Sequence, residues 1–239
     1  MPGTDSSSAS ASPLPQPFPS PQLRHILEEA RTAGFLGPGP LDAHLRHAQG
    51  FVALCRHLWP DGPTPPLLLD LGSGGGLPGL VVAAHWPEVA LVLLDAQGRR
   101  TAFLRNAVHR LGFGSRVSVR QDRAEAAGRD PDLRGYFDGV LARSFGPPAV
   151  VAECAAPLLR PGGWLAVSEP PADSPVGPPD GPADPAGPIR WPAEPLRQLG
   201  LVPDRLMHEE FGYQLLRQAV PCPDRFPRRN GVPAKRPLF

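Results

Sequence analysis

The amino-acid sequence predicts an α/β fold with one mostly parallel sheet and helices on both of its faces. From Leu67 onward, short apolar runs alternate with amphipathic stretches, which is typical of strands alternating with helices. The apolar runs lack polar alternation, so we expect strands that are buried on both sides. The first run, residues 67–71, is followed by a glycine-rich turn, as at the ligand-binding edge of a doubly wound sheet.

Before this region the chain is expected to form a tail and a small helical cap. Residues 1–22 lack the charged start and apolar core of a secretory signal, and they are predicted to be a disordered tail. The cap, residues 23–60, is predicted to contain two helices, 23–34 and 41–59, because apolar residues recur there at helical spacing.

Residues 61–220 are expected to form the main domain, with a seven-stranded sheet. The first five strands are predicted at 67–71, 90–96, 116–121, 137–143 and 162–169, and the helices between them at 79–86, 99–112 and 148–159. Residues 170–195 hold ten prolines and are expected to be a flexible insertion with neither helix nor strand. A helix over 194–200 and a hairpin over 201–220 would complete the sheet.

The turn after the first strand has the spacing of a nucleotide-type binding loop. Residues 74–79 satisfy G-x-G-x-x-G, and Asp95 ends the second strand where a ribose-binding acid belongs. No Gly-Lys-Ser/Thr follows, so a P-loop is disfavoured. A glycine-rich turn that binds no ligand is the alternative.

Asp70 distinguishes between the cofactors that such a loop can hold. It lies two positions before Gly72, where a carboxylate would repel the pyrophosphate of NAD or FAD. S-adenosylmethionine carries an ammonium and a sulfonium and has a ribose but no phosphate, so it fits the pattern Asp70-x-Gly72-x-Gly74. An ordinary capping role for Asp70 is the alternative.

The residues after the fourth strand narrow the reaction. The Asn/Asp-Pro-Pro-aromatic motif of enzymes that methylate exocyclic amines is replaced by Ala142-Arg143-Ser144-Phe145. Cys222, the cysteine of a Pro-Cys pair, lies far along the chain in the tail, which disfavours a nucleophilic thiol. The N7 atom of guanine has a free lone pair, so its methylation needs positioning and desolvation but no catalytic acid or base. We therefore expect no catalytic side chain of that kind.

At this point the sequence resembles the RsmG (GidB) family, which methylates N7 of a guanine in small-subunit (16S) ribosomal RNA. The resemblance rests on the glycine turn with Leu77-Pro78-Gly79, on Leu94-Asp95, Arg123-Ala124-Glu125 and Phe137-Asp138, on Ala142-Arg143-Ser-Phe145, and on the ending Pro227-Arg228-Arg229-Asn-Gly231. It implies a Rossmann-like class I methyltransferase fold. It also implies that S-adenosylmethionine is contacted by Gly72, Leu77, Ala124, Glu125 and Arg143.

Each of these residues also has a plainer interpretation. Glu125 could cap a helix, Arg143 could pair with Asp122 or Glu125, and Leu77 could simply pack the turn.

The sequence also departs from the family's pattern. Relatives have His-x-x-Asp-Ser where this chain has His44-Leu-Arg-His47-Ala48, and the family's Asn-Leu-Thr stretch is replaced by residues 36–41. We expect the two histidines to be partly exposed surface residues. Glu169 stands where relatives carry a lysine, and it is expected to weaken RNA contact near the methyl donor.

The C-terminal tail, residues 221–239, supplies a local basic patch in a chain whose net charge is only +1. Arg228, Arg229 and Lys235 are predicted to contact RNA phosphates, the alternative being a solvated terminus. Because the pocket is assigned to the first four strands, removing residues 225–239 is expected to leave cofactor affinity near that of the wild type if the pocket and the fold are preserved.

Partner and location follow from the same features. We expect a cytoplasmic, monomeric enzyme that acts on 16S ribosomal RNA or the small subunit, with no metal and no membrane segment. The three cysteines are widely spaced and odd in number, which favours reduced thiols. Two alternatives remain open: a diverged small-molecule methyltransferase, and a non-catalytic ribosome-assembly factor that binds S-adenosylmethionine.

Overall fold

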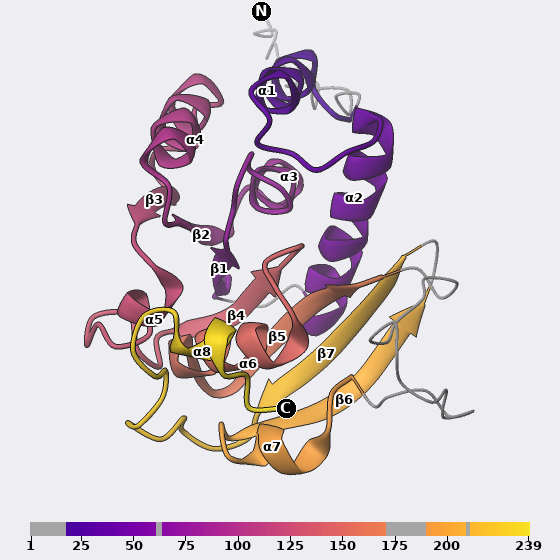
Figure 1. Cartoon of the computed structure of the whole chain (residues 1–239). Helices are drawn as coiled ribbons and strands as arrows, with labels where there is room; N and C mark the ends of the chain where they lie inside the picture. Colours follow the sequence, from indigo (N-terminus) through magenta and orange to yellow (C-terminus); the bar gives the residue numbers. More distant parts are fainter. Residues whose placement is uncertain (1–17, 61–63, 171–189, 209–210) are drawn as a thin grey trace, which may run out of the picture.

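The computed structural model describes residues 18–60, 64–170, 190–208 and 211–239. Within them, seven strands form one sheet in the order β3-β2-β1-β4-β5-β7-β6 (Figure 1). The strands are β1 Leu67–Leu71, β2 Ala90–Asp95, β3 Val117–Gln121, β4 Phe137–Ala142, β5 Leu159–Glu169, β6 Leu201–His208 and β7 Gly212–Gln218. Neighbours among β1 to β5 pair in parallel, and β7 runs antiparallel to both β5 and β6. The predicted seven-stranded, mostly parallel sheet is confirmed.

Helices cover both faces of this sheet (Figure 1). One face carries α1 Pro21–Thr32, α2 Leu41–Leu58, α3 Gly79–His85 and α4 Gly98–Arg110, and the other carries α5 Ala124–Ala127, α6 Pro148–Ala155, α7 Ala193–Arg197 and α8 Val232–Lys235. The four leucines of β1 lie between two layers of helices, which explains why the strand is apolar apart from Asp70. Leu68 packs into the core on the α1–α4 side, whereas Leu69 and Leu71 pack into the core on the other side.

The helical cap begins two residues before its predicted start. Ser20 caps α1, its hydroxyl accepting a hydrogen bond of 3.2 Å from the N–H of Leu23, and Pro21 suits the first helical position because it needs no hydrogen-bond partner there. Both predicted cap helices form. Residues 1–17 of the predicted disordered tail lie outside the described residues.

The structure corrects two boundaries around β5. Helix α6 ends at Ala155, four residues earlier than predicted, and Leu159 already belongs to β5. Pro157 lacks an N–H, which prevents the α-helix from continuing through it.

The prediction that residues 170–195 contain no helix is wrong at its end, because α7 begins at Ala193. Pro195 fits there since the first turn of a helix has N–H groups without intrahelical partners. Residues 171–189 of this predicted insertion lie outside the described residues.

Glu169, the last residue of β5, forms hydrogen bonds with residues 190 and 191. Its Oε1 accepts a hydrogen bond of 2.7 Å from the indole of Trp191, and its Oε2 accepts one of 2.6 Å from Arg190. Both carboxylate oxygens are thus used inside the protein. The expectation that Glu169 opposes RNA near the methyl donor is replaced by this structural role.

Candidate functional site

The turn between β1 and α3 places three glycines in a left-handed backbone conformation. The φ angle is +73° at Gly72, +54° at Gly74 and +98° at Gly76, a region that residues with a Cβ rarely adopt. At Gly72 a Cβ would also lie 2.5 Å from Cδ2 of Phe145. Both constraints favour glycine, and they allow a close approach of the backbone to a neighbouring group.

A pocket of about 480 Å³ opens beside this turn. One side is formed by the turn and by the residues that follow β4, and the other by segment 34–38 of the cap with His44. Of the eight predicted cofactor residues, the pocket lining includes Gly72, Gly74, Leu77 and Arg143. The lining does not include Asp70, Asp95, Ala124 or Glu125.

Asp70 lies buried beneath the glycine turn. Its Oδ2 accepts a hydrogen bond of 2.9 Å from the N–H of Gly79, whereas its Oδ1 is buried without a hydrogen-bond partner among the described residues. Burial raises the pKa of Asp70 to about 7, although Gly79, Ser73 and the charge of Arg143 act in the opposite direction. Asp70 therefore caps the turn, as the plainer interpretation holds, and keeps one oxygen and its charge close to the pocket.

Asp95 fastens the same turn to the end of β2. Its Oδ2 accepts a hydrogen bond of 3.0 Å from the N–H of Gly74 and its Oδ1 one of 2.8 Å from Gln97. Arg100, which lines the pocket, lies 3.7 Å from Asp95 Oδ2. The carboxylate of Asp95 thus holds two lining residues, Gly74 and Arg100, in place without lining the pocket itself.

Ala124 and Glu125 lie buried at the start of α5, and the C-terminal segment contacts Glu125. Oε1 of Glu125 accepts hydrogen bonds from the N–H of Gly231 at 2.7 Å and from Arg123 at 3.2 Å. Burial acts to raise the pKa of Glu125, but these bonds outweigh it and hold the pKa below its usual value. Glu125 is therefore an ionised acceptor for the C-terminal segment.

Arg143 contacts two histidines of the cap and not the acids that its plainer interpretation named. Its Nη2 lies 2.6 Å from Nδ1 of His44, and its Nε lies 3.4 Å from Nδ1 of His47. His44 is only 7% exposed. The prediction that the histidines are partly exposed is wrong for His44, because α2 presents it to the residue after β4, almost a hundred residues away in the sequence, and it holds for His47, which is half-buried.

The other residues that the sequence analysis missed belong to the cap and to helix α4. Segment 34–38 lines the pocket although it is a Gly- and Pro-rich loop without periodicity. Its place is decided by the packing of α1 and α2, so no local signal could have identified it. Arg100 did carry a signal, since it lies in the first turn of the helix that follows Asp95.

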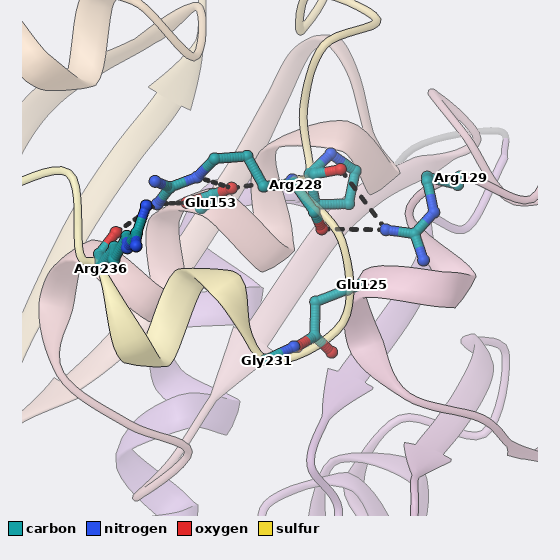
Figure 2. A network of polar contacts seen from close by, with 7 residues as sticks. Glu125, Arg129, Glu153, Arg228, Gly231 and Arg236 are labelled. Atoms are coloured by element: carbon teal, nitrogen blue, oxygen red, sulfur yellow. Dashed lines mark hydrogen bonds and ion pairs between the residues drawn. The ribbon is translucent and has the colours of Figure 1, made fainter.

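The C-terminal segment is packed against the α5–α6 side of the molecule (Figure 2). Arg228 donates from Nε to Oε1 of Glu153 at 2.8 Å and from Nη2 to Oε2 at 2.6 Å, and its backbone N–H also binds Oε1. Glu153 is fully buried. Arg129, two residues after the end of α5, donates to the carbonyl of Arg228 at 2.9 Å, and Phe226 is buried in the core.

These contacts change the interpretation of the tail. The guanidinium of Arg228 is held by a buried carboxylate, so its predicted contact with RNA phosphate is replaced by an anchoring role. Arg229 and Lys235 are exposed. The expectation that removal of residues 225–239 spares cofactor affinity required a preserved fold, and the deletion would act on that condition, because it uncovers Glu125 and leaves the buried Glu153 without its partner.

Other kinds of site find little support in the described parts of the chain. There, no group of three or more His, Cys, Asp or Glu side chains could hold a metal ion. Burial raises the pKa of the Cys222 thiol to about 12, which keeps it protonated and poorly nucleophilic. No helix among the described residues is long and apolar enough to cross a membrane.

Comparison with solved structures identifies the fold. A methyltransferase from Geobacter sulfurreducens has a TM-score of 0.55 at 14% identity and covers 85% of this chain and 91% of its own. An O-methyltransferase family protein from Burkholderia thailandensis has a TM-score of 0.53 at 19% identity, covering 74% of this chain and 58% of its own. The predicted Rossmann-like class I methyltransferase fold is confirmed.

Comparison of sequences identifies the family. A family model described as GidB, rRNA small subunit methyltransferase G, matches residues 44–168. A protein of Prochlorococcus marinus named ribosomal RNA small subunit methyltransferase G is 40% identical over 195 residues, covering 76% of this chain and 74% of the relative. Both matches agree with the resemblance seen in the motifs, and the chain therefore belongs to the family of ribosomal RNA small subunit methyltransferases G.

Proposed function

We propose that this protein transfers a methyl group from S-adenosylmethionine to N7 of a guanine in 16S ribosomal RNA. Family membership supports the reaction class and the RNA substrate. The observation that supports this cofactor is the pocket at the glycine turn, where Arg143 lies in the wall and interacts electrostatically with the buried carboxyl of Asp70.

The donor set of this pocket fits the amino-acid end of the cofactor. Arg143 uses Nε and Nη2 within the protein, and its Nη1 has no hydrogen-bond partner among the described residues, so it can donate to a carboxylate. Among the described residues Asp70 Oδ1 has no hydrogen-bond partner, and the ionised form of this carboxyl would attract a nearby ammonium. When bound, S-adenosylmethionine supplies an electrophilic methyl group on its sulfonium.

The titratable groups of the pocket lining are consistent with an acceptor that needs no deprotonation. Within the described residues the lining contains Arg100, Arg143 and His44. The arginines stay protonated and cannot act as bases, and Nδ1 of His44 is engaged by Arg143. What the pocket can do is orient the reactants and exclude water, the requirements of guanine N7.

The basic surface that we propose for RNA binding includes two of the three basic tail residues predicted from the sequence. Arg229 and Lys235 are exposed, and we assign them to phosphate contacts. Arg228 remains inside the anchoring network of Figure 2.

The test is to map N7-methylguanine in small-subunit ribosomal RNA from cells with and without the gene. We expect one modified guanine to lose its methyl group, and purified protein with S-adenosylmethionine to restore it on 16S RNA or isolated subunits. Unchanged methylation in the deletion strain would contradict the proposal. Cofactor binding by calorimetry together with no methyl transfer to any form of the RNA would favour the non-catalytic alternative.

A further inference from the structure

The cap helix α2 brings two histidines to Arg143: His44, which lines the pocket, and His47, which does not. Arginine donates hydrogen bonds and never accepts them, so Nδ1 of both His44 and His47 must be an unprotonated acceptor toward Arg143. In each ring the proton then lies on Nε2. For His44 this agrees with the 3.0 Å contact between Nε2 and the carbonyl of Gly37.

The surroundings favour the neutral form of both rings. Burial, followed by the positive charge of Arg143, lowers the pKa of His44. The same causes, with His44 itself, lower the pKa of His47 to about 4. The ionisable groups coupled to this cluster are Arg143, Asp70 and Tyr213, and Asp70 and Tyr213 both act to keep Arg143 charged.

The ring of His47 is held from several sides. It stacks on Phe211 with centroids 4.5 Å apart and planes at 3°. The hydroxyl of Tyr213 donates to the carbonyl of His47 at 2.6 Å. Gly50 permits this approach, because a Cβ at position 50 would lie 2.0 Å from the hydroxyl oxygen of Tyr213. Strand β7 thus locks α2 and the ring in place.

The burial of His47 also has a free-energy cost that packing alone does not explain. Its Nε2 is buried without a hydrogen-bond partner among the described residues. Buried polar groups are normally paired, and an unpaired one calls for an explanation. Among the described residues, the hydrogen bond that the ring does make is the one it accepts from Nε of Arg143.

We propose that His44 and His47 are positioning residues that accept hydrogen bonds from Arg143 and thereby aim its Nη1 group, which has no hydrogen-bond partner among the described residues, into the pocket. This inference rests on the proposed function only in what Arg143 receives there. Hydrogen bonds from Arg143 to His44 and from His44 to the carbonyl of Gly37 link the cap directly to the proposed cofactor site. The cap is therefore part of the binding machinery.

Two substitutions at each histidine separate positioning from simple packing. Asparagine places an oxygen acceptor near the position of Nδ1, whereas glutamine places its amide near Nε2. We expect His44→Gln and His47→Gln to weaken S-adenosylmethionine binding about tenfold or more in calorimetry, since each loses a hydrogen bond to a charged group. His44→Asn and His47→Asn should recover most of that affinity. His57→Gln, at an exposed position of the same helix, is the control.

A second measurement needs neither cofactor nor RNA. Long-range ¹H–¹⁵N spectra report the tautomer of each histidine, and exchange of the Arg143 Nε proton with solvent reports how firmly the guanidinium is held. We expect Nε2–H tautomers at neutral pH, with faster exchange of the Arg143 proton in His47→Gln than in His47→Asn.

The outcomes separate this inference from the proposed function. Glutamine and asparagine variants that behave alike in binding and exchange, or wild-type histidines protonated on Nδ1, would overturn the positioning role even if the RNA is methylated. Loss of binding and faster exchange in the glutamine variants would support it even if 16S RNA proves to be the wrong substrate. Thermal unfolding of every variant checks that the differences do not come from loss of the fold.

Discussion

Arg228 and Arg229 are adjacent arginines for which the structure predicts opposite consequences of substitution. Arg228→Ala removes the two side-chain hydrogen bonds to Glu153, at 2.8 and 2.6 Å, and leaves the backbone bond of 2.8 Å. The carboxylate of Glu153 then keeps its burial and loses its counter-charge. Arg229→Ala removes an exposed side chain whose proposed partner is RNA phosphate.

The size of the effect follows from the burial of Glu153. Breaking a buried ion pair by removing one partner costs about 3–5 kcal/mol, because the other charge remains uncompensated. Side-chain exposure is 0% for Glu153 and 27% for Arg228, so some water can enter the gap, and the backbone bond is retained. We therefore expect the low end, about 3 kcal/mol, which corresponds to a fall in Tm of about 6–12 °C for a domain of this size.

The assay is urea denaturation of wild type, Arg228→Ala and Arg229→Ala, followed by RNA binding at several salt concentrations. Arg229→Ala should stay within about 0.5 kcal/mol of wild type in its free energy of unfolding, but reduce the salt slope of RNA affinity by about 0.7–0.9. Arg228→Ala should lower the free energy of unfolding but leave the salt slope of RNA affinity unchanged, when RNA binding is measured at a temperature where the variant is folded. The reasoning fails if Arg228→Ala unfolds like wild type, or if it flattens the salt slope as much as Arg229→Ala does.

Three further results are expected from the glycine turn, from Asp70 and from Glu169. Gly72→Ala should weaken S-adenosylmethionine binding by more than about tenfold, because its Cβ would meet Phe145 at 2.5 Å; Gly112→Ala, with a similar φ of +70° and open space around its Cβ, should leave cofactor binding intact. The pKa of Asp70 is raised to about 7 in the folded protein. The folded state therefore holds a proton that the unfolded chain releases at lower pH, and stability from this group is lost as pH rises through about 7. Asp70→Asn should lack that loss in urea denaturation at about pH 5.5 and 8, and an unchanged pH dependence would refute the assignment. Glu169→Gln should lower the free energy of unfolding by about 1 kcal/mol through weaker bonds to the 190–191 segment, with no change in the salt slope of RNA binding.

Local patterns in the sequence were sufficient for the sheet and for the cofactor turn. Strand β1 lies between two cores, so nearly every position had to be apolar, and a continuous apolar run is visible without knowledge of the fold. The left-handed angles of Gly72, Gly74 and Gly76 are likewise a property of single residues. Glycine is the residue that adopts them readily. Such features depend only on the residues of the local segment, and this is why the fold class and the position of the ligand-binding turn could be predicted.

The partners of charged side chains were decided by the tertiary structure alone. Glu153 and Arg228 are far apart in the sequence, as are His44 and Arg143, and each pair meets only because the sheet and its covering helices bring them together. Nothing in the sequence around Arg228 distinguishes it from Arg229, since both belong to one basic stretch. The difference is that the guanidinium of Arg228 reaches a carboxylate that folding has removed from water, where its charge must be compensated, while Arg229 remains exposed to solvent, where we propose that it contacts RNA.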